Sequence, residues 1–324
     1  MTMNRNHFEA IPLTIKGVKL TKAQEVKFLS FINSIKRASI IYRGVDGKYL
    51  KKRYDTDTSN LPLLSDLLFL YGDKGKAFCE KIKVDNDINN LEKICFKSIL
   101  SELKETFTNR DSNSDSVNKH LYKFMKDNRN PINNLISMNE DEWCEKIESL
   151  PEEVKIAIKD YYISFLHTIE KAGYGKYSYF LSTTNSMKSA KYFRRHDIVN
   201  GIIIVGWTNN KRIKCTDRPE LKNIVDGYGF PTFNTVVYPE QHEITYKCGL
   251  LPHYIIGYYY KDSFEINPYI LKIEELGKVR RSGLPVNQEL FLKFLSKTKF
   301  KSYYEVCDCF YSQRGYHKMP SETK

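Results

Sequence analysis

Residues 238–260 are Tyr238-Pro-Glu-Gln-His-Glu-Ile-Thr-Tyr-Lys-Cys-Gly-Leu-Leu-Pro-His-Tyr-Ile-Ile-Gly-Tyr-Tyr-Tyr260, a polar and acidic cluster followed by two strand patterns with a turn between them. The β-branched and aromatic residues on both sides of the Gly-Leu-Leu-Pro turn are typical of strands. A carboxylate at the mouth of a strand is held by a rigid element while its head can face a cleft, as catalytic acids are usually held. The alternative is that Gln241 and Glu243 are only the solvent side of an edge strand, and this stretch alone favours that alternative.

The composition is that of a globular protein. The chain has 324 residues, 41% of them hydrophobic and 13% aromatic, which is enough for one large domain or two smaller ones with a sizeable core. No apolar run approaches the length of a membrane span, and the first residues lack the apolar core of a signal peptide. The seven Cys are scattered, give no zinc spacing and fit a reducing compartment. We therefore expect a cytoplasmic protein with no metal site and no membrane association.

The net charge of +12 is concentrated toward both ends of the chain. Residues 1–54 hold 12 Lys or Arg against 3 Asp or Glu, and residues 272–324 hold 11 against 6, whereas the middle is slightly acidic. Positive charge at both ends favours a polyanionic partner, and the alternative is a surface that only promotes solubility. Lys51, Lys52 and Arg53 are the candidate nucleic-acid contacts in the first basic stretch.

An N-terminal helix and a strand are predicted first. The helix begins at a capping box, Thr21-Lys-Ala-Gln24, carries Val26, Phe28, Leu29, Ile32 and Ile35 on its apolar side, and ends near residues 36–37. A buried strand, 38–44, follows and delivers Arg43 to its exit. An arginine there is costly to bury without an anion, so it either forms a salt bridge with a neighbouring carboxylate or binds phosphate or ribose oxygens.

The rest of the chain divides into a mostly helical stretch, 60–172, and a β-rich stretch, 174–275. In the helical stretch, a long helix is expected after Pro151 and should stop by Gly173 or Gly175. The elements expected later are strands at 177–184, 198–207, 232–238 and 269–273, a helix over 186–195 capped by Asn185 or Thr184, and a C-terminal helix near 288–295.

Three polar motifs then stand at strand ends: Arg43, Ser182-Thr-Thr184 and Gln241-His-Glu243. The order of these motifs resembles that of the Arg-Ser-Glu class of mono-ADP-ribosyltransferases. The first motif is a strand ending in Tyr-Arg-Gly, and the second is a strand ending in Phe-Leu-Ser-Thr-Thr before a helix with Ala-Lys-Tyr-Phe. The third is Gln-x-Glu, which opens a late strand. The resemblance covers the β-rich half and the Arg43 strand, but not the helical stretch. Thr184 stands where Ser is commoner in the family, and Gln241 stands where some members have Glu.

This resemblance implies an α+β fold, in which one domain over 1–324 has a split β-sandwich ADP-ribosyltransferase core, a large helical insertion at 60–172 and a β-rich catalytic half at 174–275. NAD would be the substrate and would lie in the cleft of the sandwich; no Gly-x-Gly-x-x-Gly follows a strand, so a Rossmann mode is not supported. Breaking the nicotinamide–ribose bond builds an oxocarbenium-like centre, as in glycoside hydrolysis, and a carboxylate stabilises it. The family assigns this catalytic role to Glu243.

The resemblance also implies roles for the other motif residues. Ser182 would bind the nicotinamide ribose and orient Glu243, and Gln241 would orient the acceptor. Arg43 would bind the phosphate or adenosine ribose of NAD, with Gly44, Thr183 and Thr184 beside it. Tyr192 or Phe193, on the following helix, would stack on nicotinamide, although core packing is the simpler expectation for Phe193.

The acceptor is expected to be RNA or single-stranded DNA. Gln-x-Glu argues against arginine as the acceptor, because a second carboxylate is what attracts a guanidinium, and the basic ends favour a nucleic acid read by exposed aromatic side chains. Intracellular enzymes of this kind resemble toxins of toxin–antitoxin or phage-defence systems, which implies an antitoxin protein as a partner. Two alternatives remain: a transferase that modifies an intracellular host protein, and a non-enzymatic basic nucleic-acid-binding protein. A Cys–His hydrolase and a glycosidase are disfavoured, because no Cys stands at a helix start and the two Glu of the cluster are too close in sequence to face one another.

Overall fold

A computed structural model describes residues 8, 10–35, 39–73, 91–108, 119–169, 171, 180–194, 199–208, 219–247, 249–250 and 252–272. The chain divides into two compact units, and each is built from more than one segment. The first, here called the sheet unit, comprises residues 1–83, 181–214 and 242–324, and the second, here called the helical unit, comprises 84–180 and 215–241. The predicted helix near 288–295 and the basic stretch after Lys272 lie outside the described residues.

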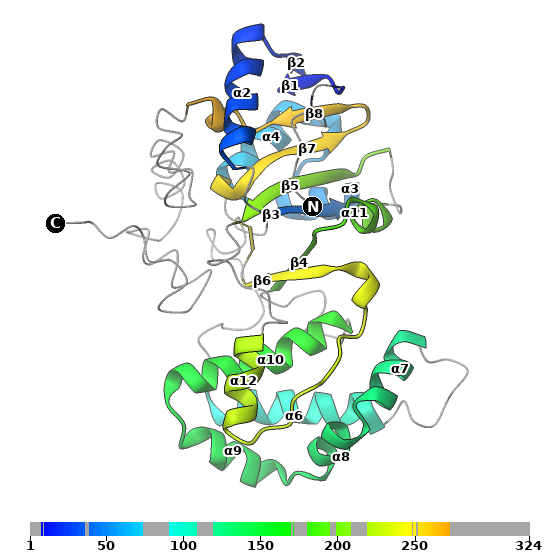
Figure 1. The fold of residues 1–324 in the computed structure, drawn as a ribbon, viewed down its shortest axis with the longest axis vertical. Helices are drawn as coiled ribbons and strands as arrows, with labels where there is room; N and C mark the ends of the chain where they lie inside the picture. Colours follow the sequence, from blue (N-terminus) through cyan, green and yellow to red (C-terminus); the bar gives the residue numbers. More distant parts are fainter. Residues whose placement is uncertain are drawn as a thin grey trace, which may run out of the picture. The chain divides into compact units, whose positions relative to one another are not determined.

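The described strands and α-helices are labelled in Figure 1. The strands are β1 (Leu13–Ile15), β2 (Val18–Lys19), β3 (Ser39–Val45), β4 (Phe180–Thr184), β5 (Ile202–Thr208), β6 (Glu243–Lys247), β7 (Ile255–Tyr260) and β8 (Ser263–Ile266). The α-helices are α2 (Lys22–Ser34), α3 (Gly47–Tyr54), α4 (Leu61–Tyr71), α6 (Lys93–Thr108), α7 (Lys119–Asp127), α8 (Arg129–Ser137), α9 (Glu140–Glu148), α10 (Glu152–Thr168), α11 (Met187–Arg194) and α12 (Pro219–Gly227). Short 3-10 helices are η1 (Thr58–Asn60), η3 (Pro239–Gln241), η4 (Pro252–Tyr254) and η5 (Pro268–Lys272).

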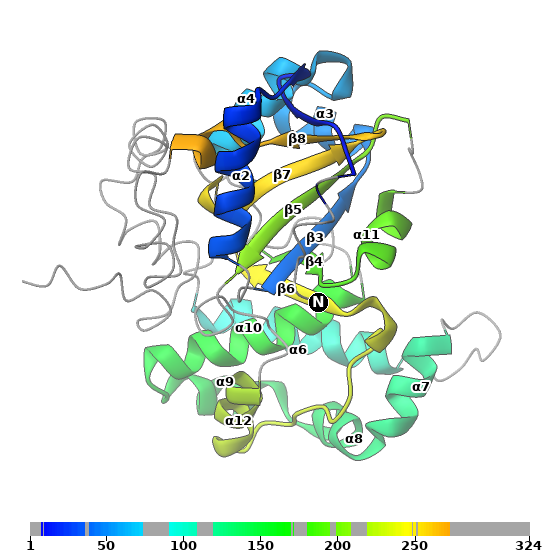
Figure 2. The same ribbon diagram turned by 45° about the horizontal axis from the view of Figure 1, so that its top comes forward.

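One eight-stranded mixed sheet, in the order β2-β1-β8-β7-β5-β3-β4-β6, forms the centre of the sheet unit. β1 pairs in parallel with β8, whereas the pairs β8–β7, β7–β5 and β5–β3 are antiparallel. This confirms the mixed helix-and-sheet class. In place of two facing sheets, the described strands form a single sheet. The pairing between β3 and β4 is the shortest, since its register consists of the one pair Tyr42–Thr184. Figure 2 shows β6 crossing the direction of β3 and β5.

Two rows of directly paired residues cross the sheet, one on each face, because paired residues on neighbouring strands point to the same side. One row is Gly44, Ile203, Tyr259 and Phe264. Phe264 packs against Phe28 of α2, with ring centroids 6.2 Å apart. At the other end of this row α11 lies so close to β3 that a Cβ on Gly44 would stand 1.9 Å from the carbonyl oxygen of Ala190. Helices α2 and α11 therefore cover the same face of the sheet.

The row on the opposite face is Arg43, Ile204, Tyr258 and Glu265. Helix α4 covers it: the Phe69 ring stacks on Tyr258 with centroids 5.8 Å apart, and the Ser65 hydroxyl lies 2.7 Å from the Tyr258 hydroxyl. Because α4 packs on the sheet in this way, it belongs to the sheet unit and not to the helical insertion expected over 60–172.

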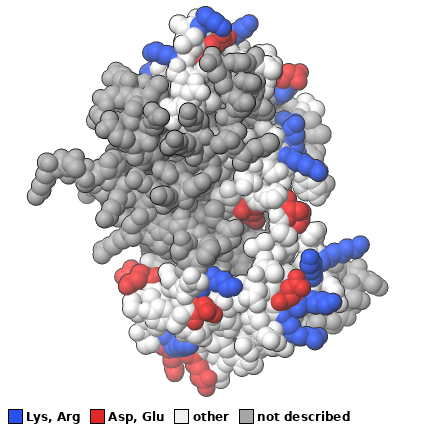
Figure 3. Space-filling model, viewed as in Figure 1, with Lys and Arg blue, Asp and Glu red and all other residues white. Residues whose placement is uncertain are grey.

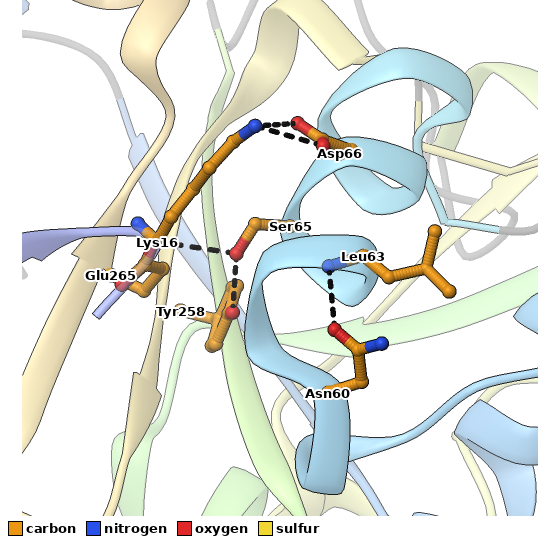
Figure 4. A network of polar contacts seen from close by, with 7 residues as sticks. All are labelled: Lys16, Asn60, Leu63, Ser65, Asp66, Tyr258 and Glu265. Carbon is orange, nitrogen blue, oxygen red and sulfur yellow. Dashed lines mark hydrogen bonds and ion pairs between the residues drawn. The ribbon is translucent and has the colours of Figure 1, made fainter. Parts of the chain in front are cut away.

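Glu265 is a buried carboxylate held by neutral donors (Figure 4). Its oxygens accept hydrogen bonds from the Thr14 hydroxyl at 2.8 Å, the Ser65 hydroxyl at 3.3 Å and the Gly17 backbone N–H at 3.1 Å, and from the Lys16 backbone N–H. Lys16 and Gly17 have left-handed backbones, with φ of 52° and 78°, which point both N–H groups at the carboxylate. This contact fixes the β1–β2 turn to β8.

An aromatic cluster forms the core of the helical unit. Phe124 of α7 and Phe165 of α10 each pack against Phe233, with ring centroids 5.1 and 4.9 Å apart, and Phe107 of α6 joins them. The long helix predicted after Pro151 is confirmed as α10, although it ends at Thr168, before the expected glycines.

Two sequence-based predictions of strands are wrong. The stretch 232–238 is irregular instead of a strand, because side chains bond its backbone: the Phe233 N–H donates to the Tyr161 hydroxyl at 2.7 Å and the Asn234 N–H to Asn128 Oδ1 at 2.6 Å. Residues 268–272 form η5, since Pro268 has no N–H for a ladder and the Asn267 side chain accepts from the Tyr269 N–H; the strand is β8, just before them.

The apolar side predicted for α2 is confirmed in part. Its capping box at Thr21 and Gln24 is confirmed. Phe28, Ile32 and Ile35 of the predicted stripe are buried. Val26 is exposed, however, and Phe31, which was not in the stripe, is buried.

Candidate active site

The three motif strands are neighbours at one end of the sheet. Arg43 lies on β3, Ser182, Thr183 and Thr184 end β4, and Glu243 begins β6, and these strands are consecutive in the order β3-β4-β6. Residues about 60 and 200 positions apart in the sequence are thereby gathered at one edge region.

Two hydrogen bonds join the hydroxyl motif to the strand of Glu243. The Thr183 hydroxyl donates to the Ile244 carbonyl at 2.7 Å, and the Asn185 N–H donates to the His242 carbonyl at 3.4 Å. Ser182–Thr184 and Glu243–Thr245 therefore lie side by side. Thr183 is used for this contact, so its hydroxyl serves the fold.

Glu243 is the first residue of β6, directly after a tight turn. Gln241 ends the 3-10 turn η3, and its N–H donates to the Tyr238 carbonyl at 3.1 Å. His242 between them has a left-handed backbone with φ of 48°, which reverses the chain before the strand. Glu243 Oε1 accepts a hydrogen bond from the Thr245 hydroxyl at 3.2 Å, and both side chains lie on one side of β6. The half-buried carboxylate is thus held by the strand that carries it.

Arg43 is paired with a buried carboxylate. Its Nε donates to Asp73 Oδ2 at 2.7 Å and its Nη1 to the backbone carbonyl of Ser182 at 2.6 Å, while the Tyr49 hydroxyl lies 2.9 Å from Asp73 Oδ1. The Asp73 side chain is 0% exposed and that of Arg43 is 18% exposed. The salt bridge to a neighbouring carboxylate, one of the two alternatives for Arg43, is therefore present.

The electrostatics of this cluster favour the charged arginine. Burial opposes the charge of Arg43, but Tyr49 and the Asp73 carboxylate outweigh it and raise the pKa of Arg43 above its ordinary value. Burial and the nearby Asp73 charge raise the pKa of Tyr49, so its phenol stays neutral and can donate to the carboxylate. Asp73 was not singled out from the sequence; the available signal was an acidic residue directly after an apolar helix that ends in Tyr-Gly.

Arg43 and Ser182 point to opposite faces of the sheet. Tyr42 is paired with Thr184, so Ser182 and Thr184 share the face of Tyr42, whereas Arg43, one residue along, faces the α4 side with Asp73. The structure thus brings Ser182 and Glu243 together by their strands, and it links Arg43 to Ser182 through the Ser182 backbone.

Helix α11 contributes exposed aromatic side chains on the Ser182 face. Tyr192 and Phe193 are 51% and 43% exposed and meet edge to face, with centroids 5.7 Å apart. The core packing expected for Phe193 is therefore wrong, and Ala190 is the buried residue of this helix, lying over Gly44. Since α11 fills the space over Gly44, that glycine allows the helix to approach the strand.

Two polar residues lie at the ends of α11. Ser186, not Asn185 or Thr184, caps the helix: its hydroxyl accepts from the Ser189 N–H at 3.3 Å, while Thr184 accepts from the Ser186 N–H at 3.0 Å. At the other end, the Nε of Arg194 is buried and forms no hydrogen bond with the part of the chain that the structure describes. Sequence reasoning did not single out this second arginine, which lies on the face of Ser182.

The candidate nucleic-acid contacts Lys51, Lys52 and Arg53 form the last turn of α3. The two lysines are exposed. The Tyr49 ring contacts two guanidinium groups: its centroid lies 5.1 Å from Cζ of Arg43 and 5.2 Å from Cζ of Arg53. Within the described residues, no group of three or more His, Cys, Asp or Glu is arranged to hold a metal ion. The described helices also include none that is long and apolar enough to cross a membrane.

Comparison with known proteins gives no match: no family model, no curated protein and no solved structure is similar to this chain.

Proposed function

We propose that this protein is an NAD-dependent mono-ADP-ribosyltransferase of the Arg-Ser-Glu class and that its acceptor is a nucleic-acid base. The observation that carries the proposal is the adjacency of β3, β4 and β6, because three motifs recognised separately in the sequence occupy three consecutive strands. Chance matches in a chain of this length would have no reason to fall on neighbouring strands.

The chemistry assigned to each residue follows from its position. The bond between the nicotinamide nitrogen and C1′ of the ribose breaks, nicotinamide leaves with the bonding electron pair, and the Glu243 carboxylate stabilises the positive charge that develops on the ribose. A nitrogen or oxygen of the acceptor attacks C1′ and loses its proton. Ser182, beside Glu243, would bind the ribose, and Gln241 would orient the acceptor.

Two further features support NAD as the substrate. Tyr192 and Phe193 present exposed rings on the Ser182 face, where nicotinamide or adenine can stack. Arg194 offers a guanidinium on that same face, whereas Arg43 is engaged by Asp73 on the other. Arg43 would therefore act in NAD binding chiefly by fixing β4, or by exchanging Asp73 for a phosphate.

The test is transfer of label. The purified protein is incubated with NAD labelled in the adenylate, together with separate pools of RNA, single-stranded DNA and protein. Label on RNA or DNA is the expected result. Label on the protein pool alone would support the alternative of a host-protein-directed transferase, and no transfer and no nicotinamide release would leave the non-enzymatic nucleic-acid-binding alternative as the better one. An activity of this kind inside a cell would also call for an antitoxin partner, which co-expression with neighbouring open reading frames would detect.

A further inference from the structure

We infer that the exposed face of α7, formed by Lys119, Tyr122, Lys123 and Lys126 and continued by Arg129, binds the phosphate backbone of a single-stranded nucleic acid. This basic face belongs to the helical unit, whose role the motifs do not explain. As a binding site for the acceptor, it rests on the proposed function.

The spacing places these residues on one side of the helix. At about 100° per residue, positions 119, 122, 123 and 126 fall within one arc. The opposite side carries Leu121 and Phe124, which are buried, and Phe124 packs against Phe165 and Phe233. The aromatic core therefore fixes the rotation of α7, and the lysines are held outward.

The junction between α7 and α8 holds Arg129, the first residue of α8, next to the end of α7. Asn128 is fully buried, its side-chain amide donates to the Phe124 carbonyl and to the Thr235 hydroxyl, both at 2.8 Å, and its carbonyl accepts from the Ile132 N–H. Because these three hydrogen bonds fix Asn128, Arg129 extends the basic face from a fixed position.

The charges of the helical unit are segregated. Residues 119–129 hold four Lys or Arg and one Asp, whereas α9 holds five Asp or Glu and one Lys. Figure 3 shows several Lys and Arg side chains over α7, with acidic side chains beside them. No described carboxylate forms an ion pair with these four cations, although Lys97 and Lys171 elsewhere in the helical unit do have such partners. A surface that only promotes solubility does not require basic and acidic residues to lie on different helices, whereas a surface that binds a polyanion does.

The dimensions and the aromatic residue fit a single strand. Lys119 and Lys126 are about 10 Å apart along the axis, given a rise of about 1.5 Å per residue. At the duplex spacing of about 3.4 Å per phosphate that length spans roughly three phosphates of one strand, and it spans fewer on an extended single strand. Tyr122, 56% exposed between the lysines, offers a ring on which an unpaired base can stack.

The basic face is also connected to the turn that carries Gln241, the residue proposed to orient the acceptor. His120, on the same helix, contacts Glu240 at 3.5 Å and the Tyr238 ring with centroids 5.5 Å apart. Glu240 lies in η3, whose last residue is Gln241. A strand bound on α7 would therefore pass close to the turn that we propose orients the acceptor.

The test measures binding in the absence of NAD. Fluorescence anisotropy with labelled oligo-uridine and oligo-thymidine is followed from 50 to 300 mM salt for the full-length protein. Replacing Lys119, Lys123 and Lys126 by alanine should reduce the magnitude of the log–log salt slope by about 2, at roughly 0.7 for each phosphate that is no longer neutralised. Tyr122→Ala should weaken binding roughly 5- to 100-fold, and Tyr122→Phe should restore it.

A matched control removes the same charge elsewhere in the helical unit, at Lys93, Lys155 and Lys222 on α6, α10 and α12. The inference is overturned if this control changes the slope as much as the α7 variant, if the α7 variant binds as the wild type does, or if polyglutamate competes as well as the oligonucleotides. The two oligonucleotides distinguish RNA from DNA. Binding through α7 without transfer of ADP-ribose would refute the proposed function alone, whereas transfer to nucleic acid with normal binding by the α7 variant would refute this surface alone.

Discussion

Two buried carboxylates on the α4 face of the sheet are stabilised differently. Asp73 contacts Arg43 at one end of the row Arg43, Ile204, Tyr258 and Glu265, and Glu265 is the other end of that row. Asp73 has a cation, Arg43, and a phenol, Tyr49. Glu265 has only hydroxyl and backbone N–H donors among the contacts described for it. The first arrangement joins β3, α3 and β4 at the end of the sheet where the candidate catalytic residues lie, and the second fixes the β1–β2 turn at the other end.

The difference teaches how each end depends on its partners. Removing the cation from a buried pair leaves an uncompensated charge, which is more costly than losing one of several neutral donors. The Asp73 end should therefore be sensitive to single substitutions, and the Glu265 end should lose stability gradually.

The largest effect is expected for Arg43→Ala. It leaves Asp73 charged and buried, so the free energy of unfolding should fall by about 3–5 kcal/mol. Arg43→Lys keeps a charge but not the fork that reaches both Asp73 and Ser182, and should lose less. Urea unfolding measures both. An apolar pair, Arg43→Met with Asp73→Leu, should recover much of the loss; if it does not, the ion pair is not the cause.

The same variants test NAD binding by calorimetry. We expect Arg43→Ala to weaken it more than Arg43→Lys, and both to weaken it. Arg194→Ala is the comparison on the opposite face. If only the Arg194 variant loses affinity, Arg43 serves the fold alone.

Next in size is Glu243→Gln, at the Asp73 end but outside the buried row. If the proposed function holds, transfer of ADP-ribose should fall by about 100- to 1000-fold, because the amide keeps the shape of the side chain and loses the charge that the proposal assigns to stabilising the ribose. The free energy of unfolding should change by less than about 0.5 kcal/mol. Glu240→Gln, in the same cluster, is the control and should lose far less activity. Full activity of Glu243→Gln on its usual acceptor would refute the assignment.

A smaller effect is expected for Glu265→Gln, which makes the two ends directly comparable. The amide NH2 must face at least one N–H or O–H donor, so the expected loss of stability is about 1–3 kcal/mol. Ser65→Ala removes one of the donors and should cost about 1 kcal/mol. Thermal unfolding of both variants beside Arg43→Ala provides the ranking. A loss at Glu265 equal to that at Arg43 would remove the distinction between the two ends.

The smallest effect is expected at α3, beside the Asp73 cluster. Replacing Lys51, Lys52 and Arg53 by alanine should raise the apparent KM for nucleic acid a few-fold and change the KM for NAD less. Losing the contact between Arg53 and the Tyr49 ring should lower the free energy of unfolding by no more than about 1 kcal/mol. Steady-state assays at two salt concentrations measure this, and an effect that does not diminish at high salt would argue against phosphate contacts.

Much of the fold was predictable from local sequence. The capping box at Thr21, the buried strands β3 and β5, and the long helix α10 each have a pattern that needs no distant partner to identify it. The irregular stretch 232–238 was not predictable in this way, because it is apolar and β-branched, and its backbone is bonded by Tyr161 and Asn128 from helices far away in the sequence.

The residues of the candidate site were chosen from the sequence, and their arrangement in the fold was not predictable from it. The sequence indicated Arg43, Ser182 and Glu243, and it left open whether Arg43 binds an anion or a carboxylate. The choice depends on Asp73, which reaches Arg43 only because α4 packs along the sheet. Likewise, two strands that are consecutive in sequence, β6 and β7, stand apart in the sheet with β5, β3 and β4 between them, and no local pattern reveals that order.

The parallel pairing of β1 with β8 has a consequence for protein synthesis. Thr14 and Glu265 are 251 residues apart. At about 5–20 residues per second, the ribosome needs roughly 12–50 s to make the chain between them. During that interval the β1–β2 pair has no β8 to join, and neither Glu243 nor the rest of β6 has been made for most of it. A nascent chain is therefore both open to mispairing at its first strands and without its candidate catalytic carboxylate until synthesis is well advanced.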